Sequence, residues 1–271
     1  MADGARPLVM GVLNVTPDSF SDGGRYLRPE DALSRGLQMV AEGADVIDVG
    51  GESSRPGAVP VGEAEELRRV VPVVEALAGE VRVSVDTVKP AVARAAVAAG
   101  ATLINDISAE LWPVAADLGV GWVALHMQGT PADMQIDPRY GNVVAEVNRF
   151  LLGRAAAADG AGVEEVWLDP GIGFGKTAAH NLALLANLRE LVALAGAGGY
   201  RVMVGTSRKR FLGAFGAAPG GEPRPVGERL EASLATSVWA MAQGASMVRV
   251  HDVGAAAQAA VLVGVVGEAA A

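Results

Sequence analysis

Polar side chains follow nearly every short apolar segment of the sequence, at the point where the segment ends. These residues are Asn14, Asp48, Asp86, Asn105, His126, Asp169, Ser207, Arg249 and His251. A single one is equally well explained as the N-cap of a following helix, because Asn, Asp and Ser are favoured there. That explanation weakens when it must hold for eight segments of one chain. Asp48 and Asp86 directly follow apolar residues, so both carboxylates need buried partners.

One subset of these residues could bind a planar heterocycle. Asp86, Asn105 and Asp169 offer carboxylate and amide groups, and Lys209 offers an ammonium donor. Together they could satisfy the paired donors and acceptors along a heterocycle's edge. The spacing of Ser, His and Asp residues indicates no nucleophilic triad, so covalent catalysis is not required.

A second subset could bind phosphate. Arg55, Arg249 and His251 can neutralise a phosphate or diphosphate, and the arginines can bind it through two hydrogen bonds. Asn14 could supply an oxygen ligand to Mg²⁺, which needs few protein ligands. The two subsets together suggest a site that holds a heterocycle while a metal-complexed diphosphate leaves.

The glycine-rich segment 169–177, DPGIGFGKT, has the composition of a ligand-binding loop. It is not a nucleotide P-loop, since G-x-x-x-x-G-K-[ST] needs glycine where the chain has Pro170. Its glycine spacing also differs from the dinucleotide-binding fingerprint. We expect Asp169, at the base of the loop, to face a flat polar ligand, and we rank Lys176 below the other cations as a phosphate ligand.

The composition excludes several classes of function. The net charge of −9 disfavours broad binding to nucleic acid or anionic membranes. The absence of cysteine excludes disulfides and thiol chemistry, and three histidines are too few for a His-rich metal centre. The first residues do not resemble a signal peptide, and no run of about twenty apolar residues occurs. We expect a soluble cytoplasmic protein.

The elements that would position these side chains are eight strand–helix units. The expected strands are 8–13, 45–49, 81–85, 102–104, 122–125, 166–168, 201–204 and 247–248. Their continuous apolar character is typical of strands buried on both faces. The number of units and the length of 271 residues favour a (β/α)₈ barrel, a TIM barrel in the α/β class, forming a single domain over 1–271 with its core at about 8–266. An open doubly wound sheet usually has a glycine-rich first turn, which 14–16 lacks.

Helices are expected between the strands. Among them, one continuous helix is predicted over 181–195, whereas the Gly- and Pro-rich segment 214–225 is predicted to be a loop. Apolar residues surround the predicted helix 230–241 instead of forming one stripe, which is compatible with barrel packing or with a subunit interface.

Eight segments resemble the motifs of the dihydropteroate synthase family, in family order and across nearly the whole chain. They are 10–24 (MGVLNVTPDSFSDGG), 50–57 with Asp48 before it, 84–87, 104–106, 126–129, 169–176, 207–211 and 249–252. The resemblance implies a transferase that condenses 6-hydroxymethyl-7,8-dihydropterin diphosphate with 4-aminobenzoate, releasing 7,8-dihydropteroate and diphosphate. It also implies a Mg²⁺ cofactor, a homodimer and a target of sulfonamides.

The resemblance also implies roles for individual residues. The pterin would contact Asp86, Asn105, Met127, Asp169, Phe174 and Lys209; the diphosphate would contact Asn14, Arg55, Arg249 and His251, with Asn14 on Mg²⁺; and 4-aminobenzoate would contact Phe20, Ser54, Pro56 and Ser207. Asp22 would stabilise the cationic methylene carbon that forms in an SN1-like displacement, with Asp18 as an alternative. Asp22, Arg55 and Lys209 are thus the expected catalytic residues.

Two departures and several open roles remain. Ser54 stands where the family most often has threonine, and segment 107–113 lacks the family's usual glycine and Asp-Pro. His126 is either a core residue that supports the loop or a ligand contact, whereas His180 is expected to be structural. Arg208 and Arg210 are either functional or surface residues.

Two other functions fit the same fold. A methyltetrahydrofolate-binding barrel should lack the sets 54–56 and 207–209, and both sets are present. A non-catalytic pterin-binding paralogue should have degraded first and second loops, and both loop sequences are intact.

Overall fold

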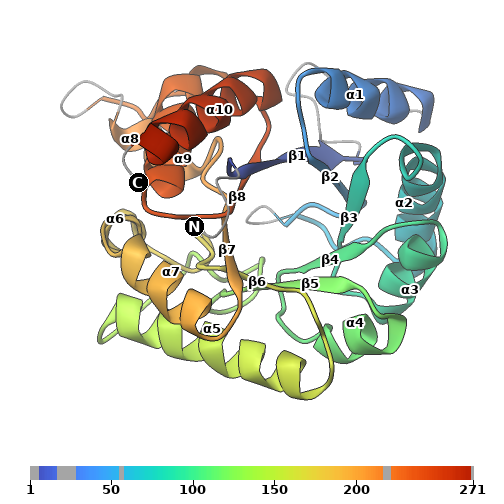
Figure 1. Cartoon of the computed structure of the whole chain (residues 1–271), viewed down its shortest axis with the longest axis horizontal. Helices are drawn as coiled ribbons and strands as arrows, with labels where there is room; N and C mark the ends of the chain where they lie inside the picture. The colour runs from blue at the N-terminus through green and yellow to red at the C-terminus, as the bar shows by residue number, and fades with distance from the viewer. Residues whose placement is uncertain (1–5, 17–28, 55–57, 216–220, 270–271) are drawn as a thin grey trace.

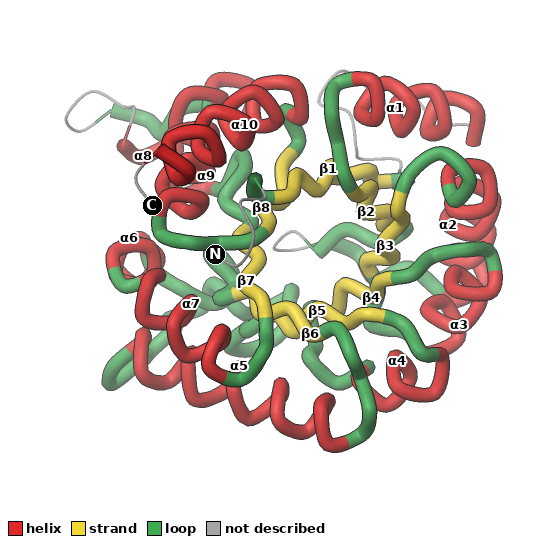
Figure 2. Tube along the Cα trace, in the orientation of Figure 1, coloured by secondary structure: helices red, strands yellow, loops and turns green. Residues whose placement is uncertain are grey.

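The strands form a closed parallel barrel in which the order around the ring is the order along the chain, as predicted (Figure 2). The computed structural model describes residues 6–16, 29–54, 58–215 and 221–269. The strands are β1 (Leu8–Asn14), β2 (Val46–Gly50), β3 (Arg82–Asp86), β4 (Leu103–Asp106), β5 (Gly121–Leu125), β6 (Val166–Asp169), β7 (Arg201–Val204) and β8 (Met247–Val250). The ring closes because β8 pairs with β1.

Helices surround the ring on the outside (Figure 1). They are α1 (Pro29–Ala41), α2 (Glu63–Leu77), α3 (Pro90–Ala98), α4 (Trp112–Leu118), α5 (Val143–Gly160), α6 (Ala178–Ala186), α7 (Leu188–Ala197), α8 (Arg210–Phe215), α9 (Leu230–Ala242) and α10 (Val253–Ala269), with a 3₁₀ turn η1 (Val226–Glu228). No helix in the described part of the chain is long and apolar enough to cross a membrane.

Alternation along the strands builds the interior of the barrel in layers. One layer consists of Met10, Val46, Leu103, Val123, Trp167, Met203 and Met247, which are all buried and contact one another. Side chains two residues apart on a strand point to the same face. Asp48, Asn105, Asp169 and Arg249 each come two residues after a member of this layer, so the alternation places them one layer nearer the carboxyl ends of the strands.

Two helical predictions were wrong in detail. The predicted helix 181–195 is interrupted, because α6 ends at Ala186 and α7 begins at Leu188. Between them, the Asn187 side chain donates to the carbonyl of Ala183 at 2.8 Å. Such local bonds from Asn compete with helical pairing and end helices. The segment 214–225 is also not loop throughout, since α8 includes residues 214 and 215.

A polar cluster lies at the amino-terminal end of the strands, opposite the predicted site. Glu165 accepts from Nη1 of Arg82 at 2.9 Å, from its Nη2 at 2.5 Å and from Nε1 of Trp167 at 2.8 Å. Burial raises the pKa of Glu165, but the hydrogen bonds from Arg82 and Trp167 lower it by more than burial raises it. The net pKa therefore lies below its ordinary value. The cluster joins β3 to the start of β6.

We expect Glu165→Gln to lower the free energy of unfolding by about 1.5 kcal/mol at neutral pH, because charge-assisted bonds are lost. The native contribution is fully present above the unfolded pKa and is lost as pH falls through the lowered folded pKa. The difference between the two proteins should therefore shrink in acid. Denaturant titrations at several pH values measure it, with exposed Glu75→Gln as the control. A pH-independent difference would contradict the argument.

Candidate functional site

Asp48 is the centre of a buried polar network at the carboxyl ends of the strands. Its side chain is fully buried. Its Oδ2 accepts from Nε of Arg249 at 2.6 Å and from Nδ2 of Asn105 at 2.8 Å. Nη2 of Arg249 also donates to Oδ2 of Asp86 at 2.7 Å. The network thus joins β2, β3, β4 and β8, and gives Asp48 and Asp86 the partners that the sequence predicted they would need.

Three buried polar atoms in this region have no hydrogen-bond partner among the described residues. They are Oδ1 of Asp48, Oγ of Ser84 and Oδ1 of Asn105, on the adjacent strands β2, β3 and β4. Buried polar groups in folded proteins are almost always hydrogen-bonded to protein, water or ligand. The arrangement therefore suits a polar ligand with donor groups along one edge.

Burial and charge pairing together set the pKa values of Asp86 and Arg249. Burial raises the pKa of Asp86, and the nearby charge of Asp48 adds to this, while Arg249 opposes it. Burial lowers the pKa of Arg249, but Asp48 and Asp86 outweigh it and raise the net pKa above the ordinary value. Arg249 therefore stays charged and is held between two carboxylates.

The loop after β6 and the loop after β7 supply a second group of side chains. Asp169 is buried, and its Oδ1 accepts the backbone N–H of Gly171 at 2.7 Å. Nζ of Lys209 lies 4.0 Å from the centre of the Phe174 ring. Burial lowers the pKa of Lys209 to about 8, against the opposing effect of Asp169. Met127 packs against the cluster that contains Phe174, so this part of the predicted pterin set is brought together.

The backbone after β6 has one shape that only glycine permits. Gly171 has φ of +64°, and a Cβ there would lie 1.8 Å from the carbonyl oxygen of His126. Lys176 fastens the same turn from inside. Its Nζ donates to the carbonyls of His126, Gly171 and Phe174 at 3.0–3.1 Å, and contacts Nδ1 of His126 at 2.9 Å. Lys176 is thus a buried side chain that stabilises this turn, in agreement with its low rank as a phosphate ligand.

The three histidines differ in their surroundings. His126 is buried, stacks edge-on against Phe150, and has its pKa lowered to about 3 by burial and by Lys176. These contacts favour the loop-supporting role. His180 is structural, as expected, since it forms a capping box with Thr177 at the start of α6. His251 contacts Oγ of Ser207 through its ring Nδ1 at 3.0 Å, and the backbone N–H of His251 donates to the same oxygen at 3.2 Å.

The first two loops are described only at their bases. Phe20, Asp22, Arg55, Pro56 and the alternative Asp18 lie outside the described residues, so their roles stay predictions. Asn14 is half-buried at the end of β1, and its Oδ1 lies 3.7 Å from a Cβ built at Gly50. Ser54 is also half-buried.

Two supporting groups were missed by the sequence analysis. Glu66 of α2 is almost fully buried, accepts from Thr87 at 2.7 Å and pairs with Lys89, which also pairs with Glu52 at the base of the second loop. In the amphipathic pattern of α2, Glu66 could not be distinguished from the exposed acids around it.

The second missed group explains the unusual segment 107–113. Asp106 is buried, and its carboxylate accepts the backbone N–H groups of Ser108, Glu110 and Leu111 at 2.7–2.8 Å. The carboxylate thus organises this loop without the glycine that the family resemblance led us to expect. The position of Asp106 directly after Asn105 was the signal that could have identified it.

Comparison with known proteins gives consistent matches. The family model described as "Pterin binding enzyme" matches residues 10–251. The dihydropteroate synthase of Mycobacterium leprae is 48% identical over 94% of this chain and 92% of its own length. The Yersinia pestis dihydropteroate synthase, solved with a sulfonamide drug complex, has a TM-score of 0.89 and 44% identity, covering 98% of this chain and 96% of that chain. The Xanthomonas albilineans enzyme with 4-aminobenzoic acid has a TM-score of 0.86 and 45% identity, covering 97% and 94%.

We expect Asp48→Ala to lower the free energy of unfolding by about 3–5 kcal/mol, because Nε of Arg249 and Nδ2 of Asn105 both lose their buried acceptor. Asp117→Ala removes the partner of Arg94 in an exposed pair and should change it by less than about 1 kcal/mol. Denaturant titration at neutral pH compares the two variants. Equal losses would show that the buried network does not stabilise the barrel.

Proposed function

The chain belongs to the pterin binding enzyme family, and from that premise we propose that it is a dihydropteroate synthase. This transferase joins 6-hydroxymethyl-7,8-dihydropterin diphosphate to 4-aminobenzoate and yields 7,8-dihydropteroate and diphosphate. The observation that carries the proposal is the convergence of Asp86, Asn105, Asp169 and Lys209 at the carboxyl ends of the barrel strands, which is where barrel enzymes build their active sites.

The pterin is held by complementary hydrogen bonds. Its amino and ring N–H groups donate to carboxylates, for which Asp169 is buried and oriented by Gly171. Oδ1 of Asn105 is a further buried acceptor with no partner among the described residues. Lys209 donates to the ring's oxygen or nitrogen acceptors, and Phe174, beneath its ammonium group, lines the slot together with Met127. Strong bonds to a fixed heterocycle orient its methylene carbon for attack.

The diphosphate faces the cationic residues. His251 and Arg249 come from the end of β8, and Arg55 and Asn14 complete the predicted set. Because Arg249 is already shared between Asp48 and Asp86, its charge also neutralises this wall, and we assign more of the diphosphate binding to Arg55 and His251.

A Mg²⁺ ion fits this donor set as a companion of the diphosphate. No group of three or more His, Cys, Asp or Glu residues in the described ranges could hold a metal alone. Asn14 offers a single hard oxygen, and Mg²⁺ commonly takes its remaining ligands from water and substrate phosphates. When bound, the ion would offset the negative charge that accumulates on the departing diphosphate.

The reaction breaks a C–O bond and forms a C–N bond. The bond between the methylene carbon and the diphosphate oxygen breaks first, leaving a cationic carbon that Asp22 stabilises electrostatically, with Asp18 as the alternative. The amine of 4-aminobenzoate then attacks this carbon and loses a proton. Ser207 and Ser54, with Phe20 and Pro56, form the proposed 4-aminobenzoate pocket.

The two alternative functions are less well supported. Lys209 lies against Phe174 in the site, and the set 207–209 would be absent from a methyltetrahydrofolate-binding barrel. A non-catalytic paralogue is disfavoured by the intact loop sequences and by 48% identity to a synthase. That the protein acts in the cytoplasm stays a prediction.

A homodimer is proposed from an apolar surface on α9 and α10. Val261, Leu262, Val265 and Val266 are each more than half exposed on the last helix, and Trp239 is nearly so on α9. The two helices pack against each other, so their outer faces are neighbours. Contiguous exposed apolar surface of this kind marks interaction sites, and a second copy would cover it.

We expect Lys209→Ala to lower kcat/KM by on the order of 100-fold while folding normally, because it removes a preorganised donor. Arg55→Ala should lose most turnover as well. A diphosphate-release assay with the pterin diphosphate, run with and without 4-aminobenzoate, measures both, and circular dichroism checks the fold. Exposed Arg210→Ala is the control for charge. Wild-type rates in both Lys209→Ala and Arg55→Ala would remove the assignment.

We expect the wild-type protein to run as a dimer in size-exclusion chromatography with light scattering, and Leu262→Asp to run as a monomer. A carboxylate in an apolar interface loses its hydration without gaining a partner. Leu37→Asp, on the exposed side of α1, should leave the mass unchanged. A monomeric wild type, or a dimeric Leu262→Asp protein, would argue against this interface.

A further inference from the structure

Arg208 has a backbone conformation that is unusual for its residue type. Its φ is +58°, in the left-handed region that few residues other than glycine adopt. It stands between two predicted substrate contacts that face in different directions. Ser207 faces the loop after β8 and contacts His251 at 3.0 Å. Lys209 faces the loop after β6, with Nζ 4.0 Å from the Phe174 ring centre. The left-handed residue turns the chain between these two contacts.

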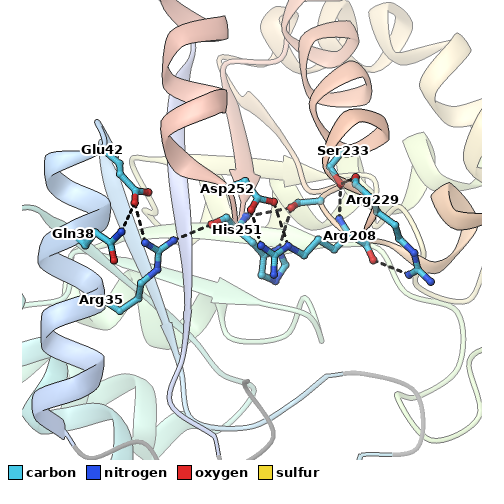
Figure 3. A network of polar contacts seen from close by, with 9 residues as sticks. Arg35, Gln38, Glu42, Arg208, Arg229, Ser233, His251 and Asp252 are labelled. Atoms are coloured by element: carbon cyan, nitrogen blue, oxygen red, sulfur yellow. Dashed lines mark hydrogen bonds and ion pairs between the residues drawn. The ribbon is translucent and has the colours of Figure 1, made fainter. Parts of the chain in front are cut away.

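Three contacts hold Arg208 in this conformation (Figure 3). Its backbone N–H donates to Oγ of Ser233 at 2.9 Å, and its carbonyl accepts from Nη1 of Arg229 at 3.1 Å. Its guanidinium donates to both carboxylate oxygens of Asp252, from Nη2 at 2.6 Å and from Nε at 3.2 Å. Planar two-point pairing of this kind fixes direction as well as distance.

Asp252, the acidic partner of Arg208, directly follows His251 in the chain. The ion pair therefore ties the loop after β7 to the loop after β8, beside the contact between Ser207 and His251. The carbonyl of His251 accepts from Nη2 of Arg35 at 3.2 Å, and Arg35 of α1 pairs with Glu42, just past the end of that helix, at 3.0 Å. Figure 3 shows this continuous network from α1 to α9.

We propose that Arg208 and Asp252 are positioning residues for the synthase reaction, an inference that rests on the proposed function. Their ion pair keeps residue 208 left-handed, so that Ser207 is presented to the 4-aminobenzoate side and Lys209 to the pterin side at the same time. Neither residue needs to touch a substrate. Breaking the pair misplaces two binding groups at once, whereas a purely structural pair would affect only stability.

The first test is a double-mutant cycle of Asp252→Asn and Arg208→Met, with steady-state kinetics for both substrates and thermal unfolding of each protein. We expect each single variant to lose roughly tenfold in kcat/KM, since small displacements of positioning groups are costly. KM should rise for both substrates, while the unfolding temperature changes little. The double variant should lose no more than the worse single variant, because both remove one interaction.

The control pair is Arg94 of α3 and Asp117 of α4, which is exposed and contains no predicted site residue. Arg94→Met and Asp117→Asn should keep wild-type kinetics. Fully additive losses at 208 and 252, or losses that follow the unfolding temperature, would overturn the inference. A wild-type protein that forms no dihydropteroate would overturn the proposed function itself, and this inference with it.

The second test separates the backbone from the guanidinium. Arg208→Gly and Arg208→Ala both remove the side chain, but glycine adopts the left-handed conformation without steric cost. We expect Arg208→Gly to retain several-fold more kcat/KM than Arg208→Ala. Equal activity of the two variants would show that the conformation of residue 208 does not position its neighbours.

Discussion

The ion pair between Asp48 and Arg249 is the interaction on which the candidate site depends. It places opposite charges inside the barrel, where removal of one partner would leave the charge of the other poorly compensated. Through Arg249 it fixes Asp86, and through Oδ2 of Asp48 it fixes Asn105. Four strands therefore present their polar groups in one relative orientation. The pair also leaves Oδ1 of Asp48 and of Asn105 unbonded within the described residues, so acceptor capacity remains for a bound ligand.

The opposite side of the site is built by different means. Asp169 is fixed by a backbone N–H and not by an ion pair, and Lys209 rests on an aromatic ring. Beneath them, Lys176 donates to the carbonyls of Gly171 and Phe174 in this loop and of His126 after β5. One side of the site is thus held by charge pairing between strands, and the other by the shape of a single loop.

The sequence was sufficient to predict the barrel and the polar side chains that lie at the carboxyl ends of its strands, because both follow from local patterns. Apolar runs of strand length followed by Asp, Asn or Ser predicted the eight strands and the side chains at their ends. Partners could not be predicted, since they depend on register: nothing local pairs Arg249 with Asp48, or Arg208 with Asp252. The break at Asn187 depends on one side-chain bond, and buried Glu66 has the same residue type as the exposed acids beside it.

The close approach at Gly171 also limits which mutations the loop after β6 can accept. Every amino-acid replacement reachable from a glycine codon by one base change adds a Cβ, and here that atom would meet the His126 carbonyl oxygen. Gly199 also has positive φ, but a Cβ there would find nothing within 4 Å, so Asn or Asp can replace it at little cost. The two glycines share a positive φ but differ in which replacements they tolerate: the surface turn has room for a side chain, and the turn after β6 does not.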